Sequence, residues 1–154
     1  MRPLTRWTTL WRSPVAPVHL VLAFVLVGTA ACGPQQTDLA VATEAVDEWI
    51  AAWNAHDPDA IGGAFTADAV YQDLSDQWSG RDSIRDHARY FKNIIREVRR
   101  IGEGRATERG TFVFRLGFDF DFGSGPGTDV GEVEVTITDR LMSRVEWLNR
   151  EQVG

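Results

Sequence analysis

The chain has 154 residues, with 16 basic and 22 acidic side chains and a formal net charge of −6. This acidic balance argues against nucleic-acid binding, because phosphate neutralisation requires clustered positive charge. Cys32 is the single cysteine, so no disulfide can form within the chain.

The first segment, residues 1–31, has the order of a bacterial export signal. Arg2, Arg6 and Arg12 give it a positive start, residues 20–27 are an unbroken apolar run, and small residues precede Cys32. This end of the segment resembles the lipobox of bacterial lipoproteins. The resemblance implies cleavage before Cys32, acylation of the cysteine, and a lipid anchor that holds the protein on the extracytoplasmic face of the cell membrane. Residues 32–37 are then a lipidated tether.

Two other interpretations of this segment stay open. The apolar run is about half of the ~20 residues needed to span a bilayer, which disfavours an uncleaved anchor helix. A signal cut at another position would leave Cys32 as a free thiol. Removal of residues 1–31 leaves 13 basic against 22 acidic residues, a net charge of −9, on a chain long enough for one domain.

The mature chain begins with two predicted helices. Residues 38–56 form an amphipathic helix, because their apolar side chains recur at spacings of three and four. That stripe consists of Leu39, Ala42, Thr43, Val46, Trp49, Ile50 and Trp53. Asp57 and Pro58 then predict a second, shorter helix, with the aspartate as N-cap and the proline in the first turn.

A strand and a third helix follow. Residues 69–74 predict a short strand with Tyr71 and Asp73 on one side. Residues 79–82 resemble a capping box and predict a helix from about 80 to 95. His87 lies within the apolar stripe of that helix.

The rest of the chain is predicted as strands, over residues 99–107, 111–122, 130–138 and 141–149. The strand at 111–122 alternates strongly, with Phe112, Phe114, Leu116, Phe118, Phe120 and Phe122 on one side. Helices segregated from a mainly antiparallel sheet indicate an α+β fold.

Four stretches, residues 49–60, 65–71, 79–84 and 144–147, resemble the nuclear-transport-factor-2-like superfamily and its SnoaL-like and limonene-epoxide-hydrolase-like branches. They extend over residues 38 to about 150, so the resemblance assigns residues 38–154 to one SnoaL-like domain. It implies a cystatin-like cone, in which a curved, mainly antiparallel sheet wraps around a long N-terminal helix and encloses an apolar pocket.

The resemblance also implies candidate site residues. Tyr71 and Asp73 stand where epoxide-hydrolase-like members carry a Tyr-x-Asn pair, and Glu146 stands where they carry an inward-facing acid. Arg115 matches the arginine of their Arg-x-Asp pair, but Gly117 replaces its aspartate. This set is incomplete, which argues against epoxide hydrolysis.

The remaining groups could still form an acid–base pocket, because burial in an apolar cone raises the pKa of a carboxyl group. Tyr71, Asp73, Glu146 and His87 are therefore the catalytic candidates. Structural alternatives stay open for three of them. Asp73 could cap the turn that follows it, Glu146 could pair with Arg144 or Arg115, and His87 could be a hydrogen-bonded histidine at the core edge.

Ligand contacts are expected from Trp53, Tyr71, Phe91, Arg115 and Glu146. Histidine, cysteine and aspartate do not cluster at ligand spacing, so neither a metal nor another cofactor is predicted. Asp119 and Asp121 are a cation site or, more simply, a solvated strand face. Val145 and Trp147 add apolar surface beyond what one small cone buries. In the family that the chain resembles, the outer sheet face commonly forms a dimer, so a homodimer is predicted.

Two functions compete. The first is a membrane-anchored module that binds a small apolar ligand or a partner protein. The second is a cofactor-independent isomerase, cyclase or hydrolase that transfers protons on a hydrophobic substrate. Export and the missing aspartate at position 117 favour the first, because cofactor-free chemistry on diffusible intermediates is usually cytoplasmic.

Overall fold

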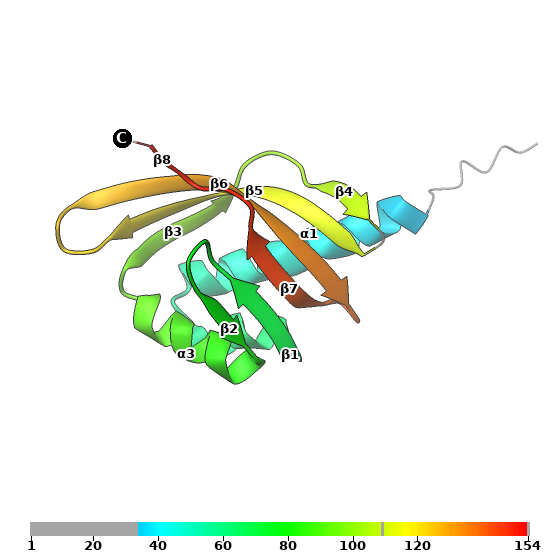
Figure 1. The fold of residues 1–154 in the computed structure, drawn as a ribbon, viewed down its shortest axis with the longest axis horizontal. Helices are drawn as coiled ribbons and strands as arrows, with labels where there is room; N and C mark the ends of the chain where they lie inside the picture. The colour runs from blue at the N-terminus through cyan, green and yellow to red at the C-terminus, as the bar shows by residue number, and fades with distance from the viewer. Residues whose placement is uncertain (1–33, 109, 154) are drawn as a thin grey trace, which may run out of the picture. The chain divides into compact units, whose positions relative to one another are not determined.

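The computed structural model describes residues 34–108 and 110–153, so the predictions on residues 1–31 and Cys32 lie outside its described residues. Figure 1 shows how the described elements are arranged. The helices are α1 (Pro34–Asn54), α2 (Pro58–Gly63) and α3 (Arg81–Phe91). The strands are β1 (Phe65–Gln72), β2 (Gln77–Ser79), β3 (Ile95–Arg100), β4 (Arg105–Glu108), β5 (Thr111–Asp121), β6 (Pro126–Thr138), β7 (Leu141–Trp147) and β8 (Glu151–Val153).

One curved, open sheet follows the order β2-β1-β7-β6-β5-β3, with β4 paired to β5 and β8 paired to β6. The β1–β7 pair is parallel, and the other described pairs are antiparallel. Helix α1 lies along the inside of the curve, and α3 stands at one end of the sheet (Figure 1). The predicted α+β fold, a mainly antiparallel sheet around a long N-terminal helix, is confirmed.

The core forms between α1 and the inner face of the sheet. Val46, Trp49 and Trp53 from the predicted stripe are buried, and they pack with Phe114 and Leu116 of β5 in one apolar cluster. Full burial of side chains of this size contributes about 1.5–3 kcal/mol each. The periodicities of α1 and β5 therefore correctly identified the face of the helix and the face of the strand that pack together.

The apolar side chains of the β5 alternation become more exposed toward its C-terminal end. Phe112, Phe114, Leu116 and Phe118 are buried as predicted, whereas Phe120 is half-buried and the side chain of Phe122 is 60% exposed. The last two phenylalanines lie beside a cavity rather than in the packed core.

Helix boundaries differ from the predictions in several places. Helix α1 begins at Pro34, so residues 34–37 are helical. The N-cap of α2 is confirmed, because Asp57 Oδ1 accepts from the backbone N–H groups of Asp59 and Ala60, each at 3.0 Å. The prediction of a capping box before α3 is wrong. Ser79 ends β2 in register with Val70, and the N-cap is Gly80, at a φ of 83° and without a side-chain cap.

The third helix ends four residues earlier than predicted, because the chain starts β3 at Ile95. The weak strand predicted at 99–107 is two strands, β3 and β4, separated by a turn with Gly102 at a φ of 76°. Asn54 ties the end of α1 to β3. Its Nδ2 donates to the carbonyl of Val98 at 2.9 Å, and its Oδ1 accepts from the N–H of Val98 at 2.7 Å.

Candidate functional site

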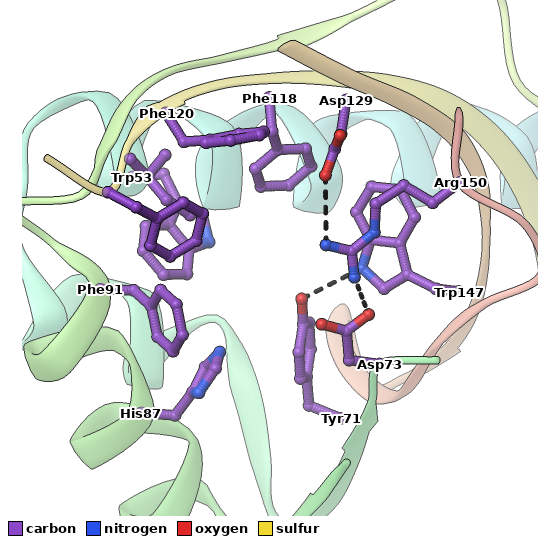
Figure 2. A pocket seen from close by; sticks show the side chains of 12 residues that line it. Trp53, Tyr71, Asp73, His87, Phe91, Phe118, Phe120, Asp129, Trp147 and Arg150 are labelled. Carbon is purple, nitrogen blue, oxygen red and sulfur yellow. Dashed lines mark hydrogen bonds and ion pairs between the residues drawn. The ribbon is translucent and has the colours of Figure 1, made fainter. Parts of the chain in front are cut away.

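A cavity of about 70 Å³ opens at the end of the sheet where α1, α3, β1, β3, β5, β6 and β7 converge. A single water needs about 10–15 Å³ of such space, so the cavity can hold a small molecule. Its lining residues, drawn in Figure 2, are Trp53, Tyr71, Asp73, His87, Phe91, Ile95, Phe118, Phe120, Phe122, Asp129, Trp147 and Arg150. Five of the predicted site residues, Trp53, Tyr71, Asp73, His87 and Phe91, are therefore brought together.

Glu146 and Arg115 do not reach this cavity. Val145 and Trp147 of β7 point into the core and are buried, so strand alternation turns Glu146 to the outer face. There Arg144 Nη2 donates to Glu146 Oε2 at 2.7 Å. Arg115 is exposed on β5, opposite Glu132 of β6. The inward placement expected for Glu146 is therefore wrong, and Arg115, from which a ligand contact was expected, does not line this cavity.

Tyr71 and Trp147 form a buried polar pair at the inner end of the cavity. Trp147 Nε1 donates to Tyr71 Oη at 3.1 Å. Burial raises the pKa of Tyr71 to about 12. The phenol is therefore neutral at physiological pH, and its own proton remains available for donation to another acceptor.

Arg150 connects two carboxylates across the cavity wall. Its Nη2 pairs with Asp73 Oδ1, its Nη1 lies 3.4 Å from Asp129 Oδ2, and its guanidinium carbon lies 5.0 Å from the ring centroid of Trp147 (Figure 2). Asp73 Oδ1 also accepts from the N–H of Leu74 at 2.7 Å. Asp73 therefore has two roles. It makes the turn contact that the sequence left open as an alternative, and it lines the cavity.

Sequence reasoning missed Asp129, Trp147 and Arg150 as site residues. The alternation of β7, counted from Val145, contained the signal for Trp147. Asp129 and Arg150 are distant in sequence from Asp73, and no local pattern connects them. Their proximity depends on β8, which pairs Asp129 with Gln152.

Within the described residues, His87 is packed against aromatic neighbours and its ring makes no hydrogen bond. Its ring centroid lies 3.7 Å from that of Trp78 and 4.6 Å from that of Phe91. Burial lowers the pKa of His87 to about 4, against the opposing effects of Asp73 and Asp76. The imidazole is therefore neutral at physiological pH and faces the cavity (Figure 2).

Trp53 contributes an unpaired donor. It is 2% exposed, and its Nε1 is buried without a hydrogen-bond partner among the described residues. The indole nitrogen is turned toward the cavity (Figure 2).

Asp119 and Asp121, which the sequence offered as a cation site or a solvated strand face, pair with arginines of β3. Arg99 Nη1 lies 2.7 Å from Asp119 Oδ2, and Arg96 pairs with Asp121. Within residues 34–108 and 110–153, three or more His, Cys, Asp or Glu side chains nowhere gather as a metal site would require. Of the helices in the described part of the chain, none is both long and apolar enough to cross a membrane.

Val145 and Trp147 are 0% and 5% exposed in the single chain. The surplus apolar surface expected from these two residues is therefore absent. The homodimer stays a prediction without that support.

Solved structures with the same fold come from several bacteria. A proposed isomerase from Bacillus subtilis has a TM-score of 0.63 at 15% identity, over 71% of this chain and 86% of its own. An LEH-like epoxide hydrolase from M. tuberculosis has a TM-score of 0.61 at 16% identity, over 71% and 84%. A ketosteroid isomerase-like protein from Catenulispora acidiphila, solved with trimethylamine, has a TM-score of 0.60 at 19% identity, over 69% and 85%.

At these identities the likeness concerns the fold alone. No curated protein matches the sequence. The SnoaL-like domain family matches residues 46–142, which include α1 from Val46 onward, strands β1 to β6 and most of the cavity wall. Because that match extends over more than half of the chain and agrees with the curved sheet around α1, the chain belongs to the SnoaL-like domain family.

Proposed function

We propose that this chain is a lipid-anchored extracytoplasmic protein whose SnoaL-like domain binds a small, mainly apolar ligand in the cavity. The observation that supports ligand binding best is the composition of the cavity wall. Seven of its twelve side chains are aromatic, namely Trp53, Tyr71, Phe91, Phe118, Phe120, Phe122 and Trp147. Ligand sites are typically concave and apolar, with a few convergent polar groups.

The state of the carboxylates favours binding over proton transfer. Asp73 and Asp129 are both engaged by Arg150, and Asp73 Oδ1 takes a further backbone hydrogen bond. Both carboxylates are therefore already used by protein partners that hold the cavity wall together. Glu146, the other acid expected in the site, lies outside it.

Ligand binding can be tested on the protein purified from its native membrane in mild detergent. Untargeted mass spectrometry should detect a small molecule that co-purifies with the wild type. Ile95→Phe narrows the cavity and should lose that molecule, whereas Glu146→Gln, on the outer face, should keep it. A molecule retained equally by both variants would place its binding elsewhere and contradict the proposal.

The anchor rests on the sequence of residues 1–32. Mass spectrometry of membrane fractions should show a diacyl or triacyl Cys32 at the mature N-terminus. The matched variant Cys32→Ala should leave the membrane fraction. A Cys32→Ala protein that stays bound would contradict the anchor and leave the ligand proposal intact.

A cofactor-independent enzyme is the second candidate, and one observation favours it. Neutral His87, neutral Tyr71 and Asp73 line the same cavity, so a base and a donor could act on one substrate. We would follow exchange of the α-protons of cyclopentanone into D₂O by NMR. Exchange above the buffer rate that is lost in both His87→Gln and Asp73→Asn would support catalysis, and exchange at the buffer rate would contradict it for this substrate type.

A further inference from the structure

We propose that the indole N–H of Trp53 is the ligand-binding donor of the cavity, and that the ligand is a neutral molecule with a hydrogen-bond acceptor, such as a carbonyl oxygen, on a small apolar body. This inference rests on the proposed ligand binding and specifies its chemistry.

The first argument is the unused donor itself. Buried polar groups in proteins are almost always hydrogen-bonded, and an unpaired one is unfavourable. Trp147, in the same cavity, donates its indole N–H to Tyr71 at 3.1 Å, whereas Trp53 Nε1 has no acceptor in the described part of the chain. A ligand acceptor in the cavity would satisfy it.

The position of Trp53 is also fixed. Its neighbour Asn54 makes two hydrogen bonds to Val98, of 2.9 and 2.7 Å, so the end of α1 is tied to β3. The indole lies among buried aromatic side chains in the core cluster. A donor that is held in place before the ligand arrives loses little entropy on binding. Trp49 Nε1 also lacks a hydrogen-bond partner among residues 34–108 and 110–153, but Trp49 does not line the cavity, which makes it a suitable control.

The second argument is charge. The titratable side chains in the cavity wall are Tyr71, Asp73, His87, Asp129 and Arg150. With the tyrosine and histidine neutral, two carboxylates face one guanidinium, so the wall carries one net negative charge. An anionic ligand would be repelled in a site of low polarity.

A cationic ligand would be attracted by this net charge, but it would have to compete with Arg150 for the carboxylates and could not accept the Trp53 N–H. Both carboxylates already hold Arg150, whose guanidinium covers the Trp147 ring at 5.0 Å. The Trp53 side chain presents its N–H, the positive edge of the indole, to the cavity (Figure 2). A neutral acceptor satisfies this donor without competing with Arg150.

Four probes of one shape can test the inference on the full chain purified in detergent. They are cyclopentanone, methylenecyclopentane, cyclopentylammonium and cyclopentanecarboxylate, each measured against protein-free micelles. For the wild type we expect cyclopentanone to bind about 3- to 10-fold more tightly than methylenecyclopentane, the range of one net hydrogen bond. The two charged probes should bind more weakly than the ketone.

The Trp53→Phe variant should bind both neutral probes with equal affinity, while Trp49→Phe should keep the preference for the ketone. In the wild type, the assigned ¹H–¹⁵N resonance of the Trp53 indole should shift with cyclopentanone and not with methylenecyclopentane. This readout decides the matter even if Trp53→Phe fails to fold.

The outcomes separate the two proposals. If methylenecyclopentane and cyclopentanone both fail to bind, the proposed function loses its support for ligands of this size and the inference falls with it. If both bind but the ketone preference is absent or survives in Trp53→Phe, or the Trp53 resonance does not move, the inference alone is overturned. Tighter binding of cyclopentylammonium would overturn it as well.

Discussion

Two arginine–carboxylate clusters lie near the end of β7, and they differ in which side of the sheet they occupy. Arg144 and Glu146 pair on the outer face, with side chains 42% and 31% exposed. Arg150 pairs with Asp73 and Asp129 in the cavity wall, where the exposures are 29%, 23% and 16%. The same chemistry is a surface pair in one place and part of a candidate binding site in the other.

This difference has an energetic consequence. Exposed ion pairs contribute about 0–1 kcal/mol, because water screens the attraction and two long side chains lose freedom. Removing one partner of a buried pair costs more, because the remaining charge is left without compensation. The predictions below test whether the inner and outer clusters behave in these two ways.

The largest effect is expected from loss of Arg150. Arg150→Met keeps the length of the side chain but leaves Asp73 and Asp129 in the cavity wall without a cation. We expect a loss of about 2–3 kcal/mol in the free energy of unfolding, between the values for an exposed and a fully buried pair, because the cluster is partly buried. Urea unfolding at pH 7 would measure it.

Arg144→Met is the matched control on the outer face, with an expected loss below about 1 kcal/mol. Equal losses in the two variants would show that the cavity cluster is as well solvated as the surface pair.

A second prediction disturbs the inner cluster without removing a charge. A Cβ on Gly131 of β6 would lie 2.1 Å from the carbonyl oxygen of Asn149 and 2.8 Å from Trp147 Cζ3. Glycine is required here by the close approach of the segment that carries Arg150. Gly131→Ala should therefore cost about 2 kcal/mol, as overpacking does, and weaken ligand binding.

Gly63→Ala is the control, because a Cβ there meets nothing within 4 Å. It should leave both stability and binding close to the wild-type values. A Gly131→Ala protein with wild-type stability would mean that the 147–150 segment shifts freely, and that Arg150 is not fixed by the fold.

The contrast between the clusters also explains what the sequence could predict. The aromatic side of the cavity wall follows from local sequence periodicity, because Trp53 belongs to the apolar stripe of α1 and Phe118 to the alternation of β5. The polar wall depended on long-range pairing, which sets Arg150 beside Asp73 at a separation of 77 residues. Glu146 was misplaced because a one-residue difference in strand register exchanges the two faces of a sheet.

A third prediction concerns pH and the neutral histidine of the cavity. Burial lowers the pKa of His87 from 6.5 to about 4, so between these values the unfolded chain binds a proton that the folded chain does not. Stability should therefore fall as the pH drops from about 6.5 to 4, with no further loss from this group below pH 4. Because His87 is only half-buried, we expect a total of about 1 kcal/mol.

Urea unfolding between pH 7 and 4 would show this slope in the wild type and a smaller one in His87→Phe. Asp119, whose pKa is lowered by its hydrogen bond to Arg99, affects stability below its ordinary value of 3.8, outside this window. An NMR titration in which His87 gains its proton near pH 6.5 would contradict the prediction.

The smallest effect is expected on the outer face, and it tests the comparison from the other side. Glu146→Gln keeps the shape of the side chain and removes the charge that pairs with Arg144. The loss in the free energy of unfolding should stay below about 0.5 kcal/mol. It should vanish in 1 M NaCl, because the Debye length there is about 3 Å. Asp73→Asn makes the same change in the cavity wall, and its larger cost should persist in salt, because partly buried pairs are screened much less than exposed ones. If salt removes both losses alike, the cavity cluster is open to ions and cannot act as the fixed polar wall of a binding site.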